Sequence, residues 1–379
     1  MSEPIESLSL SAIGRKFREG SLNAVALTQH CIGRHEPSLN AYREWTPEPA
    51  LRQAEQADEA FANAQDGGAL QGIPISVKDL YGVDDTQTFA GSPAAMPPPW
   101  QSEGEIIKGL RASHAVFSGK THTVEFAFGG LGVNSHWGTP RNPWDADRHR
   151  VPGGSSSGAG VSLCEGTALV ALGSDTAGSV RIPASMTGNV GLKTSYGRWP
   201  VSGIFPLSPT LDTAGILTKS VADAVTAFSA IDPHQRSYGP RLAREVARCS
   251  PGDFVMGTGE SALWDDCEPG ICETVEDALK TLGQAGIKTV SAPLPEAVPA
   301  IELLGVGSVV AAEIDEMLSS TAPQWRDTLD PIVSSRIRDG GSISASEYLH
   351  RHRRLRELSR SAAQRFTECQ VMISPTVAI

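Results

Sequence analysis

The chain has 379 residues, of which 40% are hydrophobic and 20% charged, and its formal net charge is −11. This composition is typical of a protein with a well-buried core and excludes a disordered chain. The negative charge argues against nucleic acids and anionic membranes as partners, because both bind basic surfaces. No run of about 18 apolar residues occurs and the N-terminus lacks the regions of a secretion signal, so we expect a cytoplasmic protein.

Helical patterns dominate the first 66 residues, where the clearest helix begins at Pro47 behind the capping residue Thr46. Further helices are predicted at 105–112, 220–228, 272–285 and 344–366. Apolar, partly β-branched runs predict short strands at 73–77, 115–118, 168–172, 254–256, 288–290 and 371–373. Strands that alternate with helices indicate an α/β sheet.

Charge clusters and metal-binding patterns are scarce. The one basic run, 350–354, falls in the last predicted helix and is interpreted as a solvated helix face. The closest cysteines, Cys267 and Cys272, have four intervening residues instead of the two of a zinc or redox knuckle. The nine histidines form no HExxH pattern. We therefore expect no disulfide framework, no metal and no cofactor.

Three motif-like stretches do not fit the chemistry they suggest. The segment 119–121 resembles the end of a phosphate-binding loop, but His114 stands where that loop needs a glycine. The segment 154–158 matches GxSxG, yet the polar residues 148–152 before it cannot form the buried strand of a nucleophile elbow. No GxGxxG follows a strand, so no nucleotide site is predicted.

A lysine and serines in Gly/Ser-rich loops are the residues that could carry chemistry. A serine hydroxyl needs an adjacent base to act as a nucleophile. Lys78 follows directly on the apolar run 73–77, where burial would favour the neutral form that can act as that base. Taken alone, a lysine at the end of a strand is more often a surface group.

Two loops hold the serines. The stretch 129–160 is rich in Gly, Ser, Asn and Pro, and the apolar strand after it favours a structured active-site loop over a linker. The loop 173–179 places small residues before Ser179, and small residues let consecutive N–H groups point to one place, as in an oxyanion hole. By itself this pattern also fits an ordinary strand-to-helix turn.

Three ordered blocks resemble the signature of the amidase signature family. They are the lysine block at 72–79, the first serine block at 151–158 and the nucleophile block at 173–184. Ser155 and Ser179 are separated by 24 positions, which is the interval of that family. Similarity continues from about residue 7 to 231 and, more loosely, from about 325 to 376.

The resemblance implies one α/β domain, 1–379, with a twisted mixed sheet covered by helices. Its parts would be an N-terminal helical segment to about 66, a catalytic core at about 67–231, a variable substrate-pocket region at about 235–320, and a helix and strand at about 325–379. The family normally continues beyond this last segment, so we expect the C-terminus to be naturally short or incomplete and the strand at 371–373 to leave a sheet edge uncovered.

The resemblance also implies a Ser-Ser-Lys triad. Ser179 would be the nucleophile, Ser155 the bridging serine and Lys78 the general base, with Ser179 forming an acyl-enzyme. The N–H groups of Thr176, Ala177, Gly178 and Ser179 would form the oxyanion hole. A cis peptide bond is expected at Gly154–Ser155, with the Ser155 hydroxyl within about 3.2 Å of both the Lys78 amine and the Ser179 hydroxyl.

The substrate implied is a small, polar amide. Ala177 and Ser157 are shared with allophanate hydrolases, which favours urea-like or carboxylated amides. Gly129 and Gly130 would line the pocket floor, and Arg336 would meet a substrate carboxylate, although a helix-surface arginine is the simpler interpretation of that residue.

Two alternatives stay open. The chain could be the amidase-type component of a tRNA-dependent amidotransferase, which needs partner subunits, or an inactive amidase-like binding scaffold. Otherwise the expected partner is a small-molecule substrate, with no nucleic acid and no membrane, and the pattern is compatible with a homodimer.

Overall fold

The computed structural model of the chain describes residues 5–235, 241–259, 262–265, 267–305, 308–338 and 340–379. The chain packs into two compact units. One comprises residues 1–243 and 324–333, and the other residues 244–323 and 334–379.

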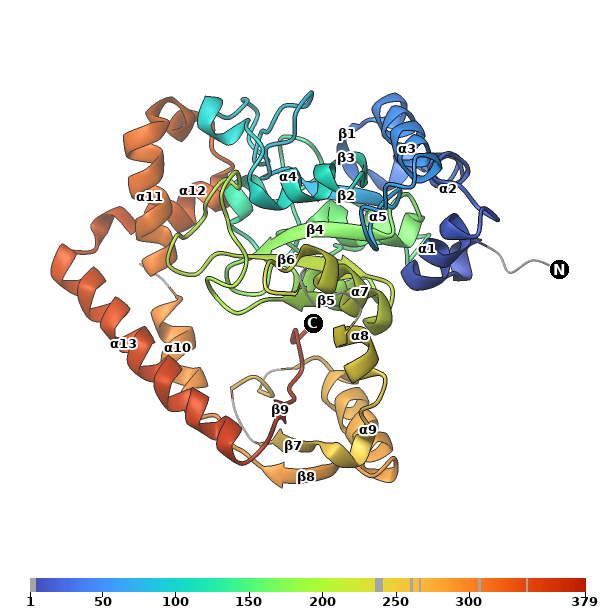
Figure 1. Cartoon of the computed structure of the whole chain (residues 1–379). Helices are drawn as coiled ribbons and strands as arrows, with labels where there is room; N and C mark the ends of the chain where they lie inside the picture. Colours follow the sequence, from blue (N-terminus) through green and yellow to red (C-terminus); the bar gives the residue numbers. More distant parts are fainter. Residues whose placement is uncertain (1–4, 236–240, 260–261, 266, 306–307, 339) are drawn as a thin grey trace. The chain divides into compact units, whose positions relative to one another are not determined.

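The first unit interleaves helices with strands along the chain (Figure 1). Its strands are β1 (Tyr42–Trp45), β2 (Pro74–Lys78), β3 (Val116–Thr121), β4 (Val170–Asp175), β5 (Val190–Lys193) and β6 (Thr213–Thr218). Its helices are α1 (Leu10–Arg18), α2 (Ala24–Ile32), α3 (Pro47–Ala62), α4 (Glu105–Ala112), α5 (Ser157–Glu165), α6 (Arg181–Met186) and α7 (Val221–Ile231), and α8 (Arg241–Val246) follows at the boundary. Short 3₁₀ turns lie at Ile5–Ser7, Pro37–Leu39, Pro98–Trp100 and Glu125–Ala127.

The described strands of this unit form one mixed sheet in the order β1-β3-β2-β4-β6-β5. Strand β2 runs parallel to both β3 and β4, and the other pairings are antiparallel. All five residues of β2 are buried, as its apolar run predicts for a central parallel strand covered on both faces. Because β2, β3 and β4 are parallel, their carboxyl ends meet at one edge of the sheet, where α/β proteins commonly build their sites.

Helix α5 packs across β2, β3, β4 and β6. Small residues allow this close approach: a Cβ added at Gly158 would lie 2.0 Å from the Ala41 oxygen, and one at Gly160 would lie 2.5 Å from Thr187 Oγ1. A buried cluster joins the helix to the sheet and to the segment after Ser179, through Ala159, Leu163, Ala171, Val180, Ala184 and Leu217. Each large apolar side chain buried there contributes roughly 1.5–3 kcal/mol.

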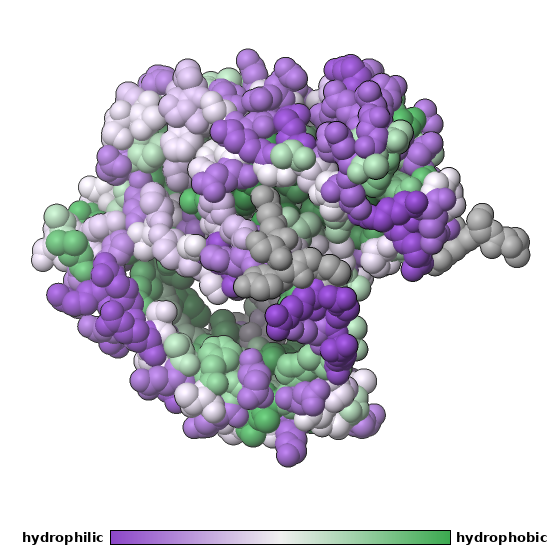
Figure 2. Space-filling model, viewed as in Figure 1, coloured by the Kyte–Doolittle hydropathy of each residue, from purple (hydrophilic) through white to green (hydrophobic). Residues whose placement is uncertain are grey.

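Helix α3 shows how the sequence pattern becomes a surface. Its buried alanines, at positions 50, 54, 57 and 60, repeat at helical spacing and face the protein. Charged residues occupy the exposed face, over which Figure 2 shows a hydrophilic surface. The helix begins at Pro47 after Thr46, as predicted, although the Thr46 side chain makes no capping hydrogen bond.

The second unit contains a small sheet in the order β8-β7-β9 among its described residues, with parallel pairings. Its strands are β7 (Val255–Thr258), β8 (Lys288–Ser291) and β9 (Val371–Met372), and its helices are α9 (Ile271–Gln284), α10 (Ala297–Leu303), α11 (Val309–Thr321) and α13 (Ala345–Ala363). Helix α12 (Pro331–Arg338) and a 3₁₀ turn at Pro323–Thr328 belong partly to each unit. Further 3₁₀ turns lie at Pro251–Asp253, Gly340–Ser342 and Gln364–Thr367. The basic run 350–354 lies on α13, where His350, Arg353 and Arg354 are exposed.

The predicted fold class, an α/β sheet of mixed strand directions covered by helices, is confirmed. The six strands predicted from apolar runs and the helices at 105–112, 220–228, 272–285 and 344–366 are all present, with ends shifted by a few residues. The helix after Ser220 begins as its capping pattern predicts, because the Ser220 hydroxyl accepts a hydrogen bond from Asp223 N–H. No helix within the described ranges is long and apolar enough to cross a membrane.

Candidate active site

Lys78 is the last residue of β2, and its side chain is fully buried at the carboxyl edge of the sheet. Its Nζ donates to Ser155 Oγ over 2.7 Å, to Ser174 Oγ over 3.0 Å and to the Ser174 carbonyl over 3.3 Å. These three acceptors match the three N–H bonds of an ammonium group. A neutral amine has two N–H bonds and one lone pair, so a hydroxyl must then donate to it.

The electrostatics favour that neutral form. Burial lowers the pKa of Lys78 to about 7, and the charges of Asp175 and Asp212, which act in the opposite direction, do not offset the loss of solvation. Around neutral pH a large fraction of Lys78 is therefore unprotonated and able to accept a proton.

Ser155 lies in the loop that leads into α5, and the predicted cis peptide bond at Gly154–Ser155 is present. Gly154 N–H donates to the Gly130 carbonyl over 2.7 Å. A Cβ at Gly154 would lie 2.6 Å from the Gly132 nitrogen and 3.1 Å from the Gly129 oxygen. The structure therefore brings Gly129 and Gly130 against Gly154, the residue before Ser155, at a position where only glycine fits.

Ser179 follows β4 in a turn held by Asp175. The Asp175 carboxylate accepts from Gly178 N–H over 2.7 Å and from Val180 N–H over 3.1 Å, on either side of Ser179. Arg181 donates to the same carboxylate through two nitrogens, over 3.0 and 2.9 Å. Burial alone would raise the pKa of Asp175, but Arg181 and these N–H groups outweigh it and lower that pKa. Asp175 thus stays ionised and fixes the backbone around Ser179.

Ser155 and Ser179 are brought together only in part. Ser156 N–H donates to the Ser179 carbonyl over 3.2 Å, so the two loops touch. The Ser155–Lys78 contact is confirmed, but among the described residues no hydrogen bond joins the Ser155 and Ser179 hydroxyls. The hydroxyl contact predicted between the two serines is therefore not formed, because the loops meet through the backbone instead.

Of the four predicted oxyanion-hole donors, Gly178 already has a hydrogen-bond partner. Gly178, at φ +131°, donates its N–H to Asp175, so this group is already used by the turn. The N–H groups of Thr176, Ala177 and Ser179 have no hydrogen-bond partner in the described part of the chain. The role of these three N–H groups as oxyanion-hole donors stays a prediction.

Ser174 and Asp212 were not singled out from the sequence. Ser174 supplies two of the three contacts of Lys78 and lines a cavity of about 270 Å³, together with Asp212 and Thr213. The Asp212 carboxylate accepts from Thr176 Oγ1 over 2.5 Å and from the N–H groups of Leu207 and Ser208, both over 2.9 Å. Burial raises the pKa of Asp212 despite these hydrogen bonds. The sequence signal for Ser174 was its position directly before Asp175, the aspartate that ends β4.

Replacing Ser174 by alanine is expected to lower kcat roughly 10- to 100-fold while KM changes little. With one N–H of neutral Lys78 bound to the Ser174 carbonyl and the other to the Ser174 hydroxyl, the lone pair is left for Ser155. Removing the hydroxyl frees the amine to rotate. Steady-state kinetics of ammonia release would check this, and an unchanged kcat in a folded variant would show that Ser174 does not orient the amine.

Arg336 lies on α12 in the part of that helix assigned to the second unit, and its side chain is exposed. Ile337 beside it is 1% exposed and anchors the helix.

Comparisons with known proteins agree on one family. The Amidase family model matches residues 23–379. A 2-amino-5-chloromuconic acid deaminase from Comamonas testosteroni is 47% identical over 98% of this chain and 80% of its own length. The amidase-type (A) component of a glutamyl-tRNA(Gln) amidotransferase from Chloroflexus aurantiacus is 31% identical over 98% of this chain and 82% of its own length.

Solved structures also indicate the amidase family. An amidase aligns with a TM-score of 0.81 at 27% identity, covering 95% of this chain and 79% of that one. A chain of a vestigial protein complex that reveals the evolutionary origins of an s-triazine catabolic enzyme aligns with a TM-score of 0.87 at 26% identity, covering 98% of this chain and 82% of that one. The chain therefore belongs to the amidase family and is a hydrolase of amide or related C–N bonds.

Proposed function

We propose that this enzyme hydrolyses a C–N bond in a small, carboxylate-bearing substrate and releases ammonia, with Ser179 as nucleophile, Ser155 as bridge and Lys78 as base. The observation that carries the proposal is the buried Lys78 amine, 2.7 Å from Ser155 Oγ, in surroundings that lower its pKa to about 7. A lysine needs this neutral state to activate a serine.

With an amide substrate, the proposed reaction begins when the Ser179 hydroxyl turns towards Ser155 and attacks the carbonyl carbon that bears the nitrogen. Its proton passes to Ser155 Oγ as the Ser155 proton passes to Lys78. Negative charge developing on an amide oxygen would be held by the N–H groups of Thr176, Ala177 and Ser179. The proton then returns along the same path to the nitrogen, which leaves as ammonia. With an amide substrate an acyl-enzyme on Ser179 remains, and water activated by the same base releases the acid.

The substrate class rests on two observations. The Comamonas protein is named for 2-amino-5-chloromuconic acid, an amino-substituted dicarboxylic acid, and nearly half of the aligned residues are identical. Ala177 and Ser157 resemble the corresponding residues of allophanate hydrolases, and this resemblance favours the same polar or carboxylated class. We therefore propose small unsaturated or amide-bearing acids as substrates, with the nitrogen on an sp² carbon. The cytoplasmic location and a homodimeric state stay predictions.

Arg336 is proposed as the partner of a substrate carboxylate, because a guanidinium pairs with a carboxylate through two hydrogen bonds. The Arg336→Gln variant should raise KM roughly 10-fold or more for a carboxylate-bearing substrate and leave KM nearly unchanged for the matching neutral amide. Kinetics on such a substrate pair would check this, with Arg338→Gln on the same helix as control. Equal effects on both substrates would remove Arg336 from the site.

A panel of 2-aminomuconic acids, small carboxamides and ureas, assayed for ammonia release by the purified chain, tests the function itself. We expect turnover of at least one carboxylate-bearing compound without added protein. Activity that appears only after addition of a tRNA-binding, B-type partner protein would favour the amidotransferase alternative, for which the 31% identical relative is the support. No ammonia release in either arm would favour the inactive scaffold.

A further inference from the structure

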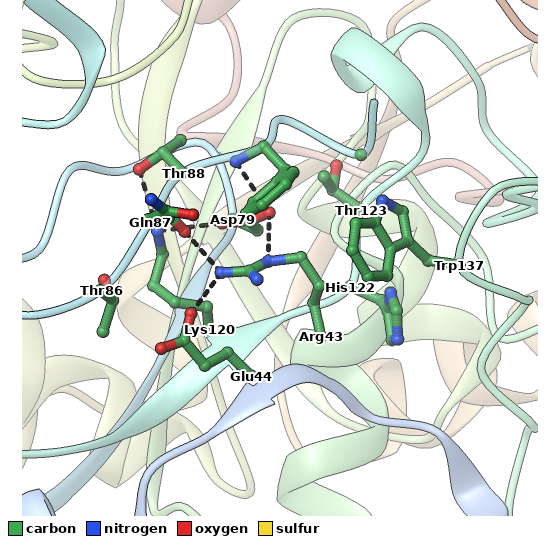
Figure 3. Close-up of polar contacts among 12 residues, drawn as sticks. Arg43, Glu44, Asp79, Thr86, Gln87, Thr88, Lys120, His122, Thr123 and Trp137 are labelled. Atoms are coloured by element: carbon green, nitrogen blue, oxygen red, sulfur yellow. Dashed lines mark hydrogen bonds and ion pairs between the residues drawn. The ribbon is translucent and has the colours of Figure 1, made fainter. Parts of the chain in front are cut away.

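A buried ion cluster adjoins the proposed base along the chain. Asp79 directly follows Lys78, and its carboxylate lies 2.8 Å from Arg43 Nε and 2.9 Å from Lys120 Nζ. The Asp79 and Lys120 side chains are each 1% exposed and that of Arg43 is 7% exposed. Figure 3 shows the guanidinium and the ammonium converging on the carboxylate from β1 and β3. The reaction as proposed above uses none of these three residues.

Strand geometry explains why they meet. Consecutive residues of an extended chain point to opposite faces, so Lys78 and Asp79 diverge. Lys120 pairs with Val77, which lies two positions before Asp79, and therefore shares the Asp79 face. The register of β1 shifts between Tyr42 and Glu44, where two β1 residues pass one β3 residue. Such a bulge re-aims a side chain, and here it delivers Arg43 to the carboxylate.

Arg43 and Lys120 each have further contacts that hold them beside Asp79. Arg43 also donates to Glu44 Oε2 over 2.6 Å and to the Gln87 carbonyl over 2.5 Å, and its guanidinium lies 4.5 Å from the centre of the Phe89 ring. Lys120 Nζ donates to Thr88 Oγ1 over 3.0 Å. Both side chains are thus held by the loop 86–90 as well as by Asp79.

This loop connects the cluster to the proposed pocket floor. Phe89 N–H donates to the Asp79 carboxylate over 3.2 Å, and Ala90 N–H to the Asp79 carbonyl over 2.9 Å. The Ala90 carbonyl in turn accepts from Phe126 N–H over 2.7 Å. A few residues further along, Gly130 accepts from Gly154, next to Ser155. Asp79 therefore ties the strand end that carries Lys78 to the loop that supports Ser155.

The charges around the two lysines are separated. Asp175 on β4 and Asp212 before β6 act on Lys78. Asp79, Arg43 and Glu44 act on Lys120, whose pKa is lowered by burial in spite of Asp79. His122, at the end of β3, has a pKa lowered to about 4 by burial and by Arg43, so it adds no charge near neutral pH. The carboxylate nearest to Lys78 in sequence is thus occupied by two other cations.

We propose that Asp79, held by Arg43 and Lys120, is a positioning residue for the amidase reaction: it fixes the Lys78 strand end and the loop behind Ser155 in register with each other. The inference rests on the proposed function of Lys78 and Ser155. Arg43 and Lys120 then act on catalysis only by positioning other residues, because neither side chain touches the reacting atoms.

The test uses Asp79→Asn, Lys120→Met and the double variant, compared by kcat, KM and urea-unfolding midpoint. Asp79→Asn leaves two buried cations without this carboxylate, and Lys120→Met leaves the buried carboxylate with one cation instead of two. Both changes should therefore lower the midpoint, and kcat should fall roughly 10- to 100-fold at nearly unchanged KM. In the double variant Lys120 and the Asp79 carboxylate are both neutralised and Arg43 keeps Glu44 as its partner, so the midpoint should lie above that of Asp79→Asn. Its kcat should stay as low as in the single variants, because the ion pairs that fix position 79 are still missing.

A control is Asp232→Asn, which neutralises another buried carboxylate, paired with the partly exposed Arg198 through Nε over 2.5 Å. It should lower the midpoint and leave kcat unchanged. The proposal is overturned if kcat recovers with stability in the double variant, or if folded single variants keep wild-type kcat. If the single variants do not fold, the double variant decides. The Ser179→Ala variant, measured in parallel, separates the two proposals. If Ser179→Ala is active, the triad is refuted. If Ser179→Ala is inactive and the double variant is fully active, only the positioning role is refuted.

Discussion

Replacing Ser179 by alanine is expected to reduce ammonia release by at least about 10³-fold while the folded structure is kept. The change removes the attacking oxygen and nothing else of size. The Asp175 carboxylate would still accept from the backbone of Gly178 and Val180, so the turn keeps its shape. The residual rate would come from the N–H donors and from substrate binding, which do not depend on the hydroxyl.

Circular dichroism and the urea-unfolding midpoint would confirm folding, and ammonia release with the best panel substrate would measure the loss. Ser185→Ala is a suitable control, because Ser185 lies on α6 close in sequence but is exposed. That control should keep full activity. A folded Ser179→Ala protein that works at the wild-type rate would remove Ser179 as nucleophile.

Replacing Lys78 by methionine is expected to lower kcat by a similar factor and to stabilise the protein near neutral pH. The folded pKa of about 7 lies below the unfolded value of 10.5, so the unfolded chain binds more protons between these values. Wild-type stability therefore rises with pH across that window, and burying Lys78 destabilises the fold below it. At about 1.4 kcal/mol per pKa unit, the methionine variant should gain a few kcal/mol at pH 7.

Unfolding in urea at pH 7 and pH 10 would measure this, and the advantage of Lys78→Met should shrink at the higher pH. In the wild type, kcat/KM should rise with pH through about 7 as the base loses its proton. A flat pH profile with chemistry rate-limiting, or a methionine variant less stable than wild type at pH 7, would contradict a buried, largely neutral Lys78.

The elements that the sequence predicted best are those with a local cause. The apolar run 73–77 gave β2, and the serine at 220 with its capping partner began α7. Lys78, Ser155 and Ser179 were found through spacing shared with a family, and the contact of Lys78 with Ser155 was expected from it. These features depend on residues close together in the chain or on a fixed interval between them.

What escaped prediction depends on which way side chains and N–H groups point. The sequence placed Asp175 and Ser174 in a loop, but only the fold shows that Asp175 holds the turn and that Ser174 holds the base. Gly178 was expected to face the substrate and instead faces Asp175. Arg43 reaches Asp79 through a shift in strand register, and register over long separations cannot be read from one sequence.

Covalent labelling tests the central claim most directly. The purified chain would be treated with a fluorophosphonate probe at several pH values, digested, and mapped by mass spectrometry. We predict a single adduct on Ser179, formed at a rate that rises through pH 7, abolished in Ser179→Ala and slowed by at least about 10²-fold in Lys78→Met. An adduct on Ser155, Ser156 or another serine, or labelling of Ser179 that is independent of pH and of Lys78, would contradict the triad.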